Sequence, residues 1–396
     1  MNEAILVLAG GASQLPFVES WRGLGLPLIL ADRDPQPPCR ELCDAFICAS
    51  VHDAGAVLSG LEQLDGKFAI RAVLTQSSGP ATLTQARVSR SLGLPSFSPE
   101  LAELALDKQR FTQFLREHGF SVPEPVSPAA PFAAPVVVRP AATRIGKDGI
   151  ALVSRAAHLA PAIARAERAS ANGAAVVTRF VPGQDWIYIG ARVAGELRRI
   201  AVVREHNAFL PAGLANLGAE LVCEPPAAAV ARIEDQIERL LALQGGGSGV
   251  LLASFRVADE QPFWTELHLE FGGDWLWEKL LRNAFGEDPI APVSRDLLAE
   301  LPRWRPPAAR SSLLYTLAHA DRAARPGVEA LAEELGLELL AERAHANRAP
   351  HHRSGAVAIA RRDPLESRAI ATRLDAQLGR GRGGMPALAP LLGVRA

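Results

Sequence analysis

The chain has 396 residues, of which 48% are hydrophobic and 21% charged, and its formal net charge is −1. This composition is typical of a globular protein with a sizeable core, and the length predicts about two to three domains. The near-zero net charge gives no attraction for nucleic acid or acidic membranes, and no apolar run reaches the roughly 20 residues that span a bilayer, so neither partner is expected.

The N-terminal region alternates strand-like and helix-like segments. Strands are predicted at 4–9, 27–31, 45–49 and 69–75. This order predicts a small, parallel, doubly wound sheet. No basic residue precedes the first apolar run, which therefore predicts a buried strand rather than a signal peptide, in a cytoplasmic protein. The Gly10-Gly11 turn lacks the G-x-G-x-x-G pattern of nicotinamide enzymes, which makes a dehydrogenase the least favoured class.

The middle of the chain mixes helices with paired strands. Helices are predicted at 106–118, 156–170 and 226–243, and strands at 136–140, 150–153, 174–180, 186–193, 196–203 and 250–257. A Pro- and Ala-rich linker is expected at 125–135. After the Trp304–Pro307 segment, strands near 313–318, 337–342 and 356–360 and helices at 328–335 and 365–378 predict a third, smaller α/β unit.

The segment T-E-L-H-L-E-F-G-G-D, residues 265–274, carries the strongest functional signal. Period-2 alternation on a strand places Glu266, His268 and Glu270 on one face. Three ionisable side chains are costly to bury unpaired, so they predict a charged cleft that holds a metal, a phosphate or a charged substrate. The alternative is an ordinary solvent-exposed antiparallel strand. A Gly-Gly bend then leads into an apolar helix from about Trp275.

In this order of parts the chain resembles the ATP-grasp superfamily, in its carboxylate–amine (L-amino acid) ligase and biotin-carboxylase-like branch. The matching segments are D-K-Q-R-F at 107–111, P-V-V-V-R-P at 135–140, T-R-I-G-K-D-G at 143–149, V-V-T-R-F-V-P-G-Q-D at 176–185 and E-L-H-L-E-F-G-G at 266–273. The resemblance implies an ATP-grasp fold, α/β and α+β. It comprises an N-terminal parallel domain (1–103), an ATP-grasp domain (104–308, with a nucleotide subdomain at about 120–187) and a small C-terminal α/β subdomain (309–396).

The resemblance also implies ATP and Mg²⁺ as cofactors. ATP carries about four negative charges, so its cleft needs fixed cations and backbone N–H donors. Lys108 and Arg139 would meet the phosphates, Phe180 and Val181 would form the adenine hinge, and Asp185 would accept from the ribose hydroxyls. The full set assigned to the nucleotide is Lys108, Arg139, Thr143, Gly146, Lys147, Gly149, Thr178, Phe180, Val181 and Asp185, with Lys147 or Arg144 folding over the phosphates.

The metal ligands depart from the family pattern. The resemblance implies Glu266 as the principal Mg²⁺ ligand, helped by His268, and Glu266, Glu270 and Arg139 as catalytic residues. The family has a second carboxylate where this chain has Ser254, an asparagine at His268 and an arginine at Glu270. Imidazole is a poorer Mg²⁺ ligand than oxygen. For Glu270 three roles are open: a replacement metal ligand, a partner for a substrate amine, or a salt bridge to a nearby Arg such as Arg256 or Arg282.

Two functions follow from the resemblance. The first is an ATP-dependent ligase that joins a small carboxylate, such as an amino acid, to an amine through an acyl phosphate. The second is a degenerate protein that binds nucleotide or metabolite without turnover, which the altered metal ligands favour. The expected partners are the two small-molecule substrates, with a homodimer as a candidate assembly.

Overall fold

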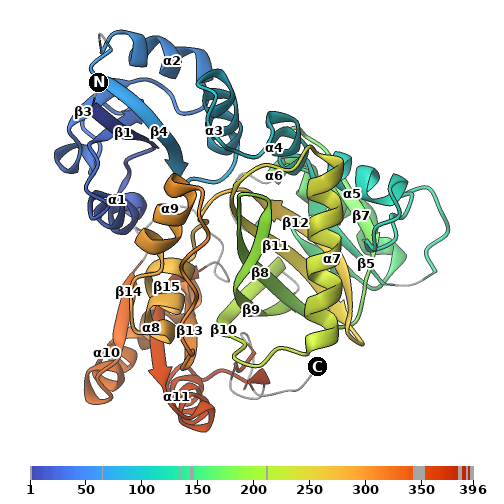
Figure 1. Ribbon diagram of the computed structural model, residues 1–396. Coiled ribbons are helices and arrows are strands. Elements are labelled where there is room, and N and C mark those ends of the chain that lie inside the picture. Colours follow the sequence, from blue (N-terminus) through green and yellow to red (C-terminus); the bar gives the residue numbers. More distant parts are fainter. Residues whose placement is uncertain are drawn as a thin grey trace.

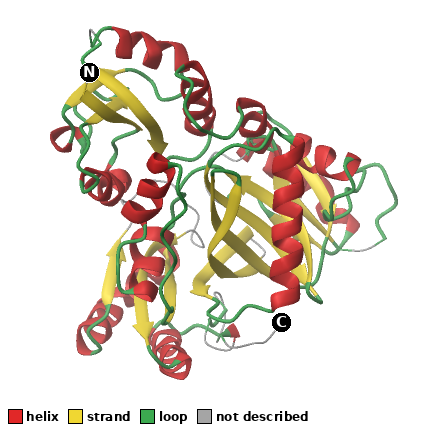
Figure 2. Ribbon diagram, viewed as in Figure 1, coloured by secondary structure: helices red, strands yellow, loops and turns green. Residues whose placement is uncertain are grey.

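The computed structural model describes residues 2–64, 66–133, 135–142, 147–210, 213–341, 353–381, 386–388 and 391–392. The described residues form a four-stranded, an eight-stranded and a three-stranded sheet, with helices packed on them (Figures 1 and 2). In this part of the chain no helix is both long and apolar enough to cross a membrane.

The N-terminal sheet is parallel and doubly wound, as predicted. Its strands are β1 (Asn2–Leu8), β2 (Leu28–Asp32), β3 (Ala45–Cys48) and β4 (Phe68–Thr75), in the order β3-β2-β1-β4. Ala4 to Leu8 of β1 are fully buried because helices cover both faces. Phe17 and Trp21 of α1 (Leu15–Arg22) pack on one face, and Val57 of α2 (Ala54–Glu62) and Val88 of α3 (Pro80–Ser91) on the other.

A small antiparallel sheet follows two short helices, α4 (Pro99–Ala105) and α5 (Lys108–Glu117). It has the order β6-β5-β7, formed by β5 (Val136–Pro140), β6 (Ala151–Val153) and β7 (Ala175–Arg179). Ala162 and Ala166 of α6 (Leu159–Ala169) pack against its valines. The helix α5 begins after Asp107, whose carboxylate accepts hydrogen bonds from two backbone N–H groups of the first turn.

The central sheet has eight strands in the order β12-β11-β8-β9-β10-β13-β15-β14, all antiparallel. They are β8 (Gln184–Val193), β9 (Glu196–Leu210), β10 (Gly213–Leu221), β11 (Gly249–Ala258), β12 (Gln261–His268), β13 (Ser311–Ala318), β14 (Glu338–Ala341) and β15 (Arg353–Arg361). The long helix α7 (Ala227–Leu243) lies along one face (Figure 1) and buries Ile233, Ile237 and Leu241 there.

The C-terminal strands continue this sheet, because β13 pairs with β10. The α/β unit expected at 309–396 therefore shares its backbone hydrogen bonds with the central domain, and the boundaries at 103 and 308 stay a prediction. The remaining helices are α8 (Arg282–Phe285), α9 (Ile290–Ala299), α10 (Arg325–Glu334) and α11 (Pro364–Gln377), with the short 3-10 helices η1 (Ala12–Gln14), η2 (Arg40–Leu42), η3 (Ala156–His158) and η5 (His319–Ala324).

Two local features differ from the sequence expectations. The strand β10 was not predicted, because its sequence is rich in Gly and Ala and lacks clear alternation. The helix expected from about Trp275 is a π-helix, η4 (Leu276–Leu281). It follows three residues in the left-handed region, Gly272 (φ 75), Asp274 (φ 63) and Trp275 (φ 57). Both π-helices and left-handed non-glycine residues concentrate at functional sites.

Candidate active site

The three ionisable residues at the end of β12 lie together, as predicted. The His268 Nε2 atom is 3.3 Å from Glu266 Oε2, and His268 Nδ1 is 3.4 Å from Glu270 Oε1. The strand ends at His268, and the Glu270 side chain beyond it is only 2% exposed. The alternative of an ordinary exposed strand therefore does not apply to Glu270, and His268 bridges the two carboxylates.

The pKa values of this cluster reflect its pairing. Burial alone would raise the pKa of Glu266, but Lys108, His268 and Arg139 outweigh it and hold that pKa well below its usual value. Burial would lower the pKa of His268, but its hydrogen bonds to Glu266 and Glu270 raise it to about 10. At neutral pH the bridge is thus an imidazolium between two carboxylates, with both of its ring N–H groups used as donors.

Two buried cations face Glu266 from separate elements. Lys108, the first residue of α5, lies with its Nζ atom 3.7 Å from Glu266 Oε1. Arg139 on β5 is 7% exposed, and its Nη1 donates to the Thr265 carbonyl at 3.3 Å. The buried Nε of Arg139 has no hydrogen-bond partner. Buried donors without a partner also occur on other arginines, among them Arg165, Arg192, Arg198 and Arg380. What distinguishes Arg139 is that its unmet donor lies on a second cation that faces Glu266, and two fixed cations suit an anionic ligand.

The predicted hinge residues lie just before and at the start of β8, beside Arg256 of β11. The Arg256 side chain contacts all three predicted hinge groups: its Nε donates to the Val181 carbonyl at 3.0 Å, its Nη1 is 3.0 Å from Asp185 Oδ1, and its guanidinium lies 5.5 Å from the Phe180 ring centroid. The second oxygen of Asp185 accepts from Asn207 at 2.9 Å. The predicted ribose acceptor is therefore paired within the chain.

The glycine-rich loop is described only in part. Thr143, Arg144 and Gly146 lie outside the described residues. The Lys147 ammonium donates to both oxygens of Glu205 on β9, at 2.9 and 3.0 Å. Burial would lower the pKa of Lys147, but Glu205 raises it above its ordinary value. Lys147 thus links the segment before β6 of the small sheet to β9 of the central sheet.

The remaining predicted loop and hinge residues have structural surroundings. Gly149 adopts φ 74, and a Cβ there would lie 2.8 Å from the Ala169 side chain, so its own turn and packing require glycine. Thr178 is buried in β7. Their assignment to the nucleotide stays a prediction.

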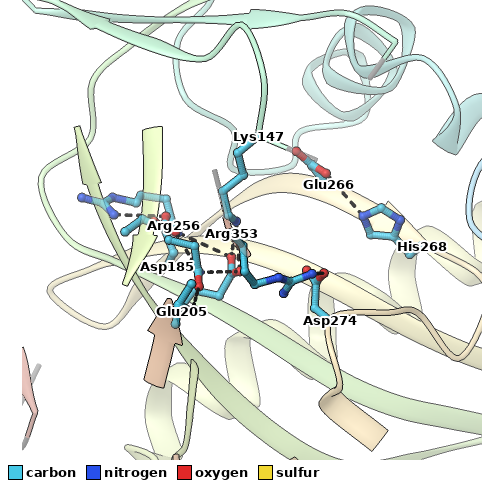
Figure 3. A network of polar contacts seen from close by, with 11 residues as sticks. Lys147, Asp185, Glu205, Arg256, Glu266, His268, Asp274 and Arg353 are labelled. Carbon is cyan, nitrogen blue, oxygen red and sulfur yellow. Dashed lines mark hydrogen bonds and ion pairs between the residues drawn. The ribbon is translucent and has the colours of Figure 1, made fainter. Parts of the chain in front are cut away.

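A continuous polar network runs across the central sheet, and several of its residues are labelled in Figure 3. It begins at Arg256 and Asp185 and passes through Asn207 to Asn216, whose side-chain nitrogen also lies 3.3 Å from Glu205. From Asn216 it reaches Thr316 on β13. Each of these groups therefore has its partner inside the protein, on five neighbouring strands of one sheet.

The left-handed bend after β12 carries a second charged pair. Arg353, the first residue of β15, pairs with Asp274 (Figure 3). Its guanidinium also lies 4.8 Å from the Trp275 ring centroid. The pairing with Arg353 lowers the pKa of Asp274. Four residues later, Glu278 in the π-helix is buried, its Oε2 has no hydrogen-bond partner, and burial raises its pKa to about 7.

The N-terminal domain contacts the same bend. Gln76, just beyond β4, donates to the Gly272 carbonyl at 2.7 Å and accepts from Gln14 at 2.8 Å. Both glutamines are buried. These bonds fix the backbone next to Glu270 against the carboxyl ends of the parallel strands.

Sequence reasoning missed part of this site and misplaced one contact. Glu270 pairs with His268, and the salt bridge suggested with Arg256 or Arg282 is wrong, because Arg256 pairs with Asp185 and Arg282 is exposed. Glu205, Asn207 and Asn216 were not identified. The alternation of Glu205 and Asn207 along one strand was a usable signal, but β10, which carries Asn216, gave none.

The side chains fit the two expected cofactors unequally. Lys108 and Arg139 suit an anionic nucleotide, since they present buried cations and an unmet donor. The carboxylates do not form a two-ion site: Ser254 stands directly across from Glu266 in the β11–β12 register, and His268 lies between Glu266 and Glu270. Within the described ranges, no group of three or more His, Cys, Asp or Glu side chains is arranged to hold a metal ion.

Comparison with known proteins gives structural but no sequence matches. No protein-family model and no curated protein matches the sequence. An L-amino acid ligase from Bacillus licheniformis has a similar structure, with a TM-score of 0.72, 16% identity, and coverage of 95% of this chain and 98% of that one. An N5-carboxyaminoimidazole ribonucleotide synthetase from Thermus thermophilus gives a TM-score of 0.68 at 18% identity, covering 96% and 100%.

A third structure, N5-carboxyaminoimidazole synthetase from Staphylococcus aureus complexed with ADP, gives a TM-score of 0.69 at 13% identity and covers 95% and 96% of the two chains. At these identities the likeness is one of fold. The chain has the ATP-grasp fold over nearly its whole length, as its motifs predicted.

Proposed function

We propose that this chain is an ATP-dependent ligase that joins a small carboxylate, such as an amino acid, to an amine. The observation that carries the proposal is the convergence of Lys108, Arg139 and Glu266, from α5, β5 and β12, in a protein with the ATP-grasp fold. Structural neighbours with this fold include an L-amino acid ligase and a synthetase complexed with ADP. A cytoplasmic location and a homodimer remain predictions.

When bound, ATP supplies a phosphoryl group that converts the carboxylate substrate to an acyl phosphate, which the amine attacks to give an amide, ADP and phosphate. The chain's own residues contribute positioning and charge neutralisation. Lys108 and Arg139 are buried on one side of the cleft, where fixed cations neutralise phosphate oxygens. The unmet Nε–H of Arg139 provides one donor for such an oxygen.

The carboxylate strand contributes the opposite charge. Glu266 holds Lys108 in place, and its low pKa keeps it ionised at neutral pH. We propose Glu266 as the principal carboxylate toward Mg²⁺, with His268 beside it. Glu270 is held by His268, which leaves its proposed role toward a substrate amine dependent on movement of the imidazole. This donor set does not fit a two-ion arrangement, because Ser254 and His268 stand where further negative ligands are needed.

A second candidate is a degenerate ATP-grasp protein that binds nucleotide without turnover. The observation that favours it is the Ser254–Glu266 register together with the imidazolium between Glu266 and Glu270. Both features remove negative ligands from the place where metal ions are expected.

One experiment addresses both candidates. Thermal shift with millimolar ATP, with and without Mg²⁺, tests nucleotide binding, since a ligand of the native state raises the melting temperature. Phosphate release with pooled amino acids and small carboxylates tests turnover. A shift with turnover supports the ligase, and a shift alone supports the second candidate. Without any shift, neither function stands. Lys279→Ala, which changes a surface lysine paired with Glu338, serves as a control for nonspecific charge effects.

A further inference from the structure

We propose that the Arg256 side chain occupies the place where the base and ribose of the nucleotide bind. It thereby lowers the affinity for the nucleotide and the share of that affinity that base and ribose contribute. This inference rests on the proposed function, because it takes Phe180, Val181 and Asp185 as the nucleotide hinge.

Arg256 uses the groups that a nucleoside needs. Its Nε–H donates to the Val181 carbonyl and its Nη1 lies on Asp185, both at 3.0 Å. The guanidinium also lies 5.5 Å from the Phe180 ring centroid, within the range of a cation–π contact. A base that donates to the Val181 carbonyl and a ribose that donates to Asp185 must therefore compete with Arg256, which already contacts both acceptors.

The position of Arg256 is fixed by the sheet. Arg256 and Asp185 are direct neighbours across the antiparallel β11–β8 pair, so their contact does not depend on closure of the cleft. The hinge itself is tightly packed on β11: Gly183 has φ 157, and a Cβ there would lie 2.2 Å from the Val257 carbonyl oxygen. The hinge cannot move away from Arg256 without breaking this pairing.

A nucleotide can displace the Arg256 side chain, so these contacts do not block the site permanently. A carbonyl oxygen has two lone pairs, and the Asp185 carboxylate has further acceptor sites. The Arg256 side chain is 19% exposed, so its head can swing toward solvent while its stem stays on the sheet. Nucleotide then binds in proportion to the fraction of molecules in which Arg256 has moved, which weakens the apparent affinity by that fraction.

Arg256 influences the two ends of the cleft differently. The phosphates are expected at Lys108 and Arg139, which contact Glu266 and the Thr265 carbonyl on β12. Inorganic tripolyphosphate carries the charge of the phosphate chain without base or ribose. It therefore reports on the phosphate end alone, whereas a non-hydrolysable ATP analogue reports on both ends.

The test is calorimetric titration of both probes into the wild type, Arg256→Leu and a matched control. The control is Arg179→Leu, which removes an arginine next to the hinge whose Nε pairs with Glu124 on the surface at 3.1 Å. In Arg256→Leu we expect the ATP analogue to bind about tenfold or more tightly, which corresponds to a competent fraction of about one-tenth in the wild type. Tripolyphosphate should bind the variant no more tightly than the wild type, and Arg179→Leu should change neither affinity.

Several outcomes overturn the inference. If Arg256→Leu binds the analogue more weakly, with tripolyphosphate unchanged, Arg256 is a direct nucleotide ligand. If the analogue affinity is unchanged, Arg256 has no role. If no protein binds either probe, the proposed function itself fails, which is a different result from the first two.

A second variant covers poor folding of the leucine variant. Arg256→Gln keeps a polar head on a shorter side chain, which should hold the Asp185 and Val181 acceptors less completely. It should give a smaller gain in analogue affinity of the same sign, with the melting temperature checked without ligand. A loss of analogue affinity in this variant contradicts the inference.

Discussion

The proposed phosphate end of the site, around Arg139, and the proposed hinge end, around Asp185, differ in how completely their polar groups are paired. At the proposed phosphate end, Arg139 keeps a buried Nε–H without a partner. At the hinge end, Arg256, Asp185 and Asn207 all have partners at 2.9 to 3.0 Å.

This difference in pairing affects how much free energy a ligand gains when it binds at each end. A buried donor without a partner costs free energy until something binds it, so ligand binding there gains an interaction without losing one. A paired group must exchange partners, so the gain is smaller. We therefore expect the phosphate end to provide most of the nucleotide affinity, and four changes test that comparison.

The largest effect is expected for Glu266→Gln. It removes the charge that faces Lys108 and Arg139 and that His268 contacts, so turnover should fall by roughly 10²-fold or more, the scale for loss of a central electrostatic group. Phosphate release under saturating ATP measures it. Glu260→Gln, in the exposed turn of the same hairpin, is the matched control and should keep full activity. Equal rates for wild type and Glu266→Gln would remove Glu266 from the mechanism.

Arg139→Met should weaken tripolyphosphate and ATP-analogue binding about 10- to 100-fold. The loss corresponds to one charge-assisted hydrogen bond of roughly 1.5–3 kcal/mol. Calorimetry measures both affinities, and Arg139→Lys should recover part of each because it keeps the charge but lacks the fork. If the analogue loses affinity while tripolyphosphate does not, Arg139 belongs to the hinge end and the comparison is wrong.

Glu278→Gln tests whether every unpaired buried atom marks a ligand. The folded pKa of Glu278, about 7, lies above the ordinary value of 4.5 because of burial. Its contribution to stability is therefore fully present below about pH 4.5 and is lost as pH rises through about 7. Glutamine has no such dependence, so the variant should be about 1–3 kcal/mol more stable than wild type at pH 8 and similar at pH 4.5.

Urea unfolding of wild type and Glu278→Gln at the two pH values makes this measurement. If the variant is less stable at pH 8, the carboxylate has a partner that stabilises its charged form, and the unmet Oε2 atom is then better explained by a bound cation. If the variant is more stable at pH 8, the buried Glu278 carboxylate destabilises the folded protein and marks no ligand site.

The smallest effect is expected for Ser254→Asp. The new carboxylate stands directly across from Glu266, so without metal ion the protein should lose about 0.2–1 kcal/mol through like-charge repulsion. Millimolar Mg²⁺ or Mn²⁺ should reverse that loss in a thermal shift, and Ser254→Asn should respond less because it adds no charge. A variant that is destabilised with or without the ion would show that His268 leaves no room for a metal site.

The sequence predicted the parts of this protein that depend on local pattern. Alternation along β12 placed Glu266 and His268 together, the run at Ala4 to Leu8 predicted a strand buried on both faces, and the helix predicted at 106–118 contains α5, which begins two residues later than expected. Each of these predictions rests on a pattern that a few neighbouring residues define.

The contacts that the sequence did not predict depend on register between distant strands. Arg256 meets Asp185 because β11 pairs with β8 across about 70 residues of chain, and nothing near Arg256 indicates which strand lies beside it. Asn216 joins the network from β10, a strand that the sequence did not predict because it is rich in Gly and Ala. The contact between His268 and Glu270 forms beyond the end of β12, where strand alternation no longer fixes the direction of a side chain.

The pairing of β13 with β10 also governs how the chain can be divided. A fragment ending near residue 308 would leave β10 with unpaired N–H and C=O groups along an open sheet edge, next to the apolar surface that Leu217 and Tyr315 share. Such an edge is a template for pairing with another molecule. Shortened versions of this protein are therefore prone to aggregate, and solubility screens of C-terminal truncations would report on the sheet rather than on the catalytic centre.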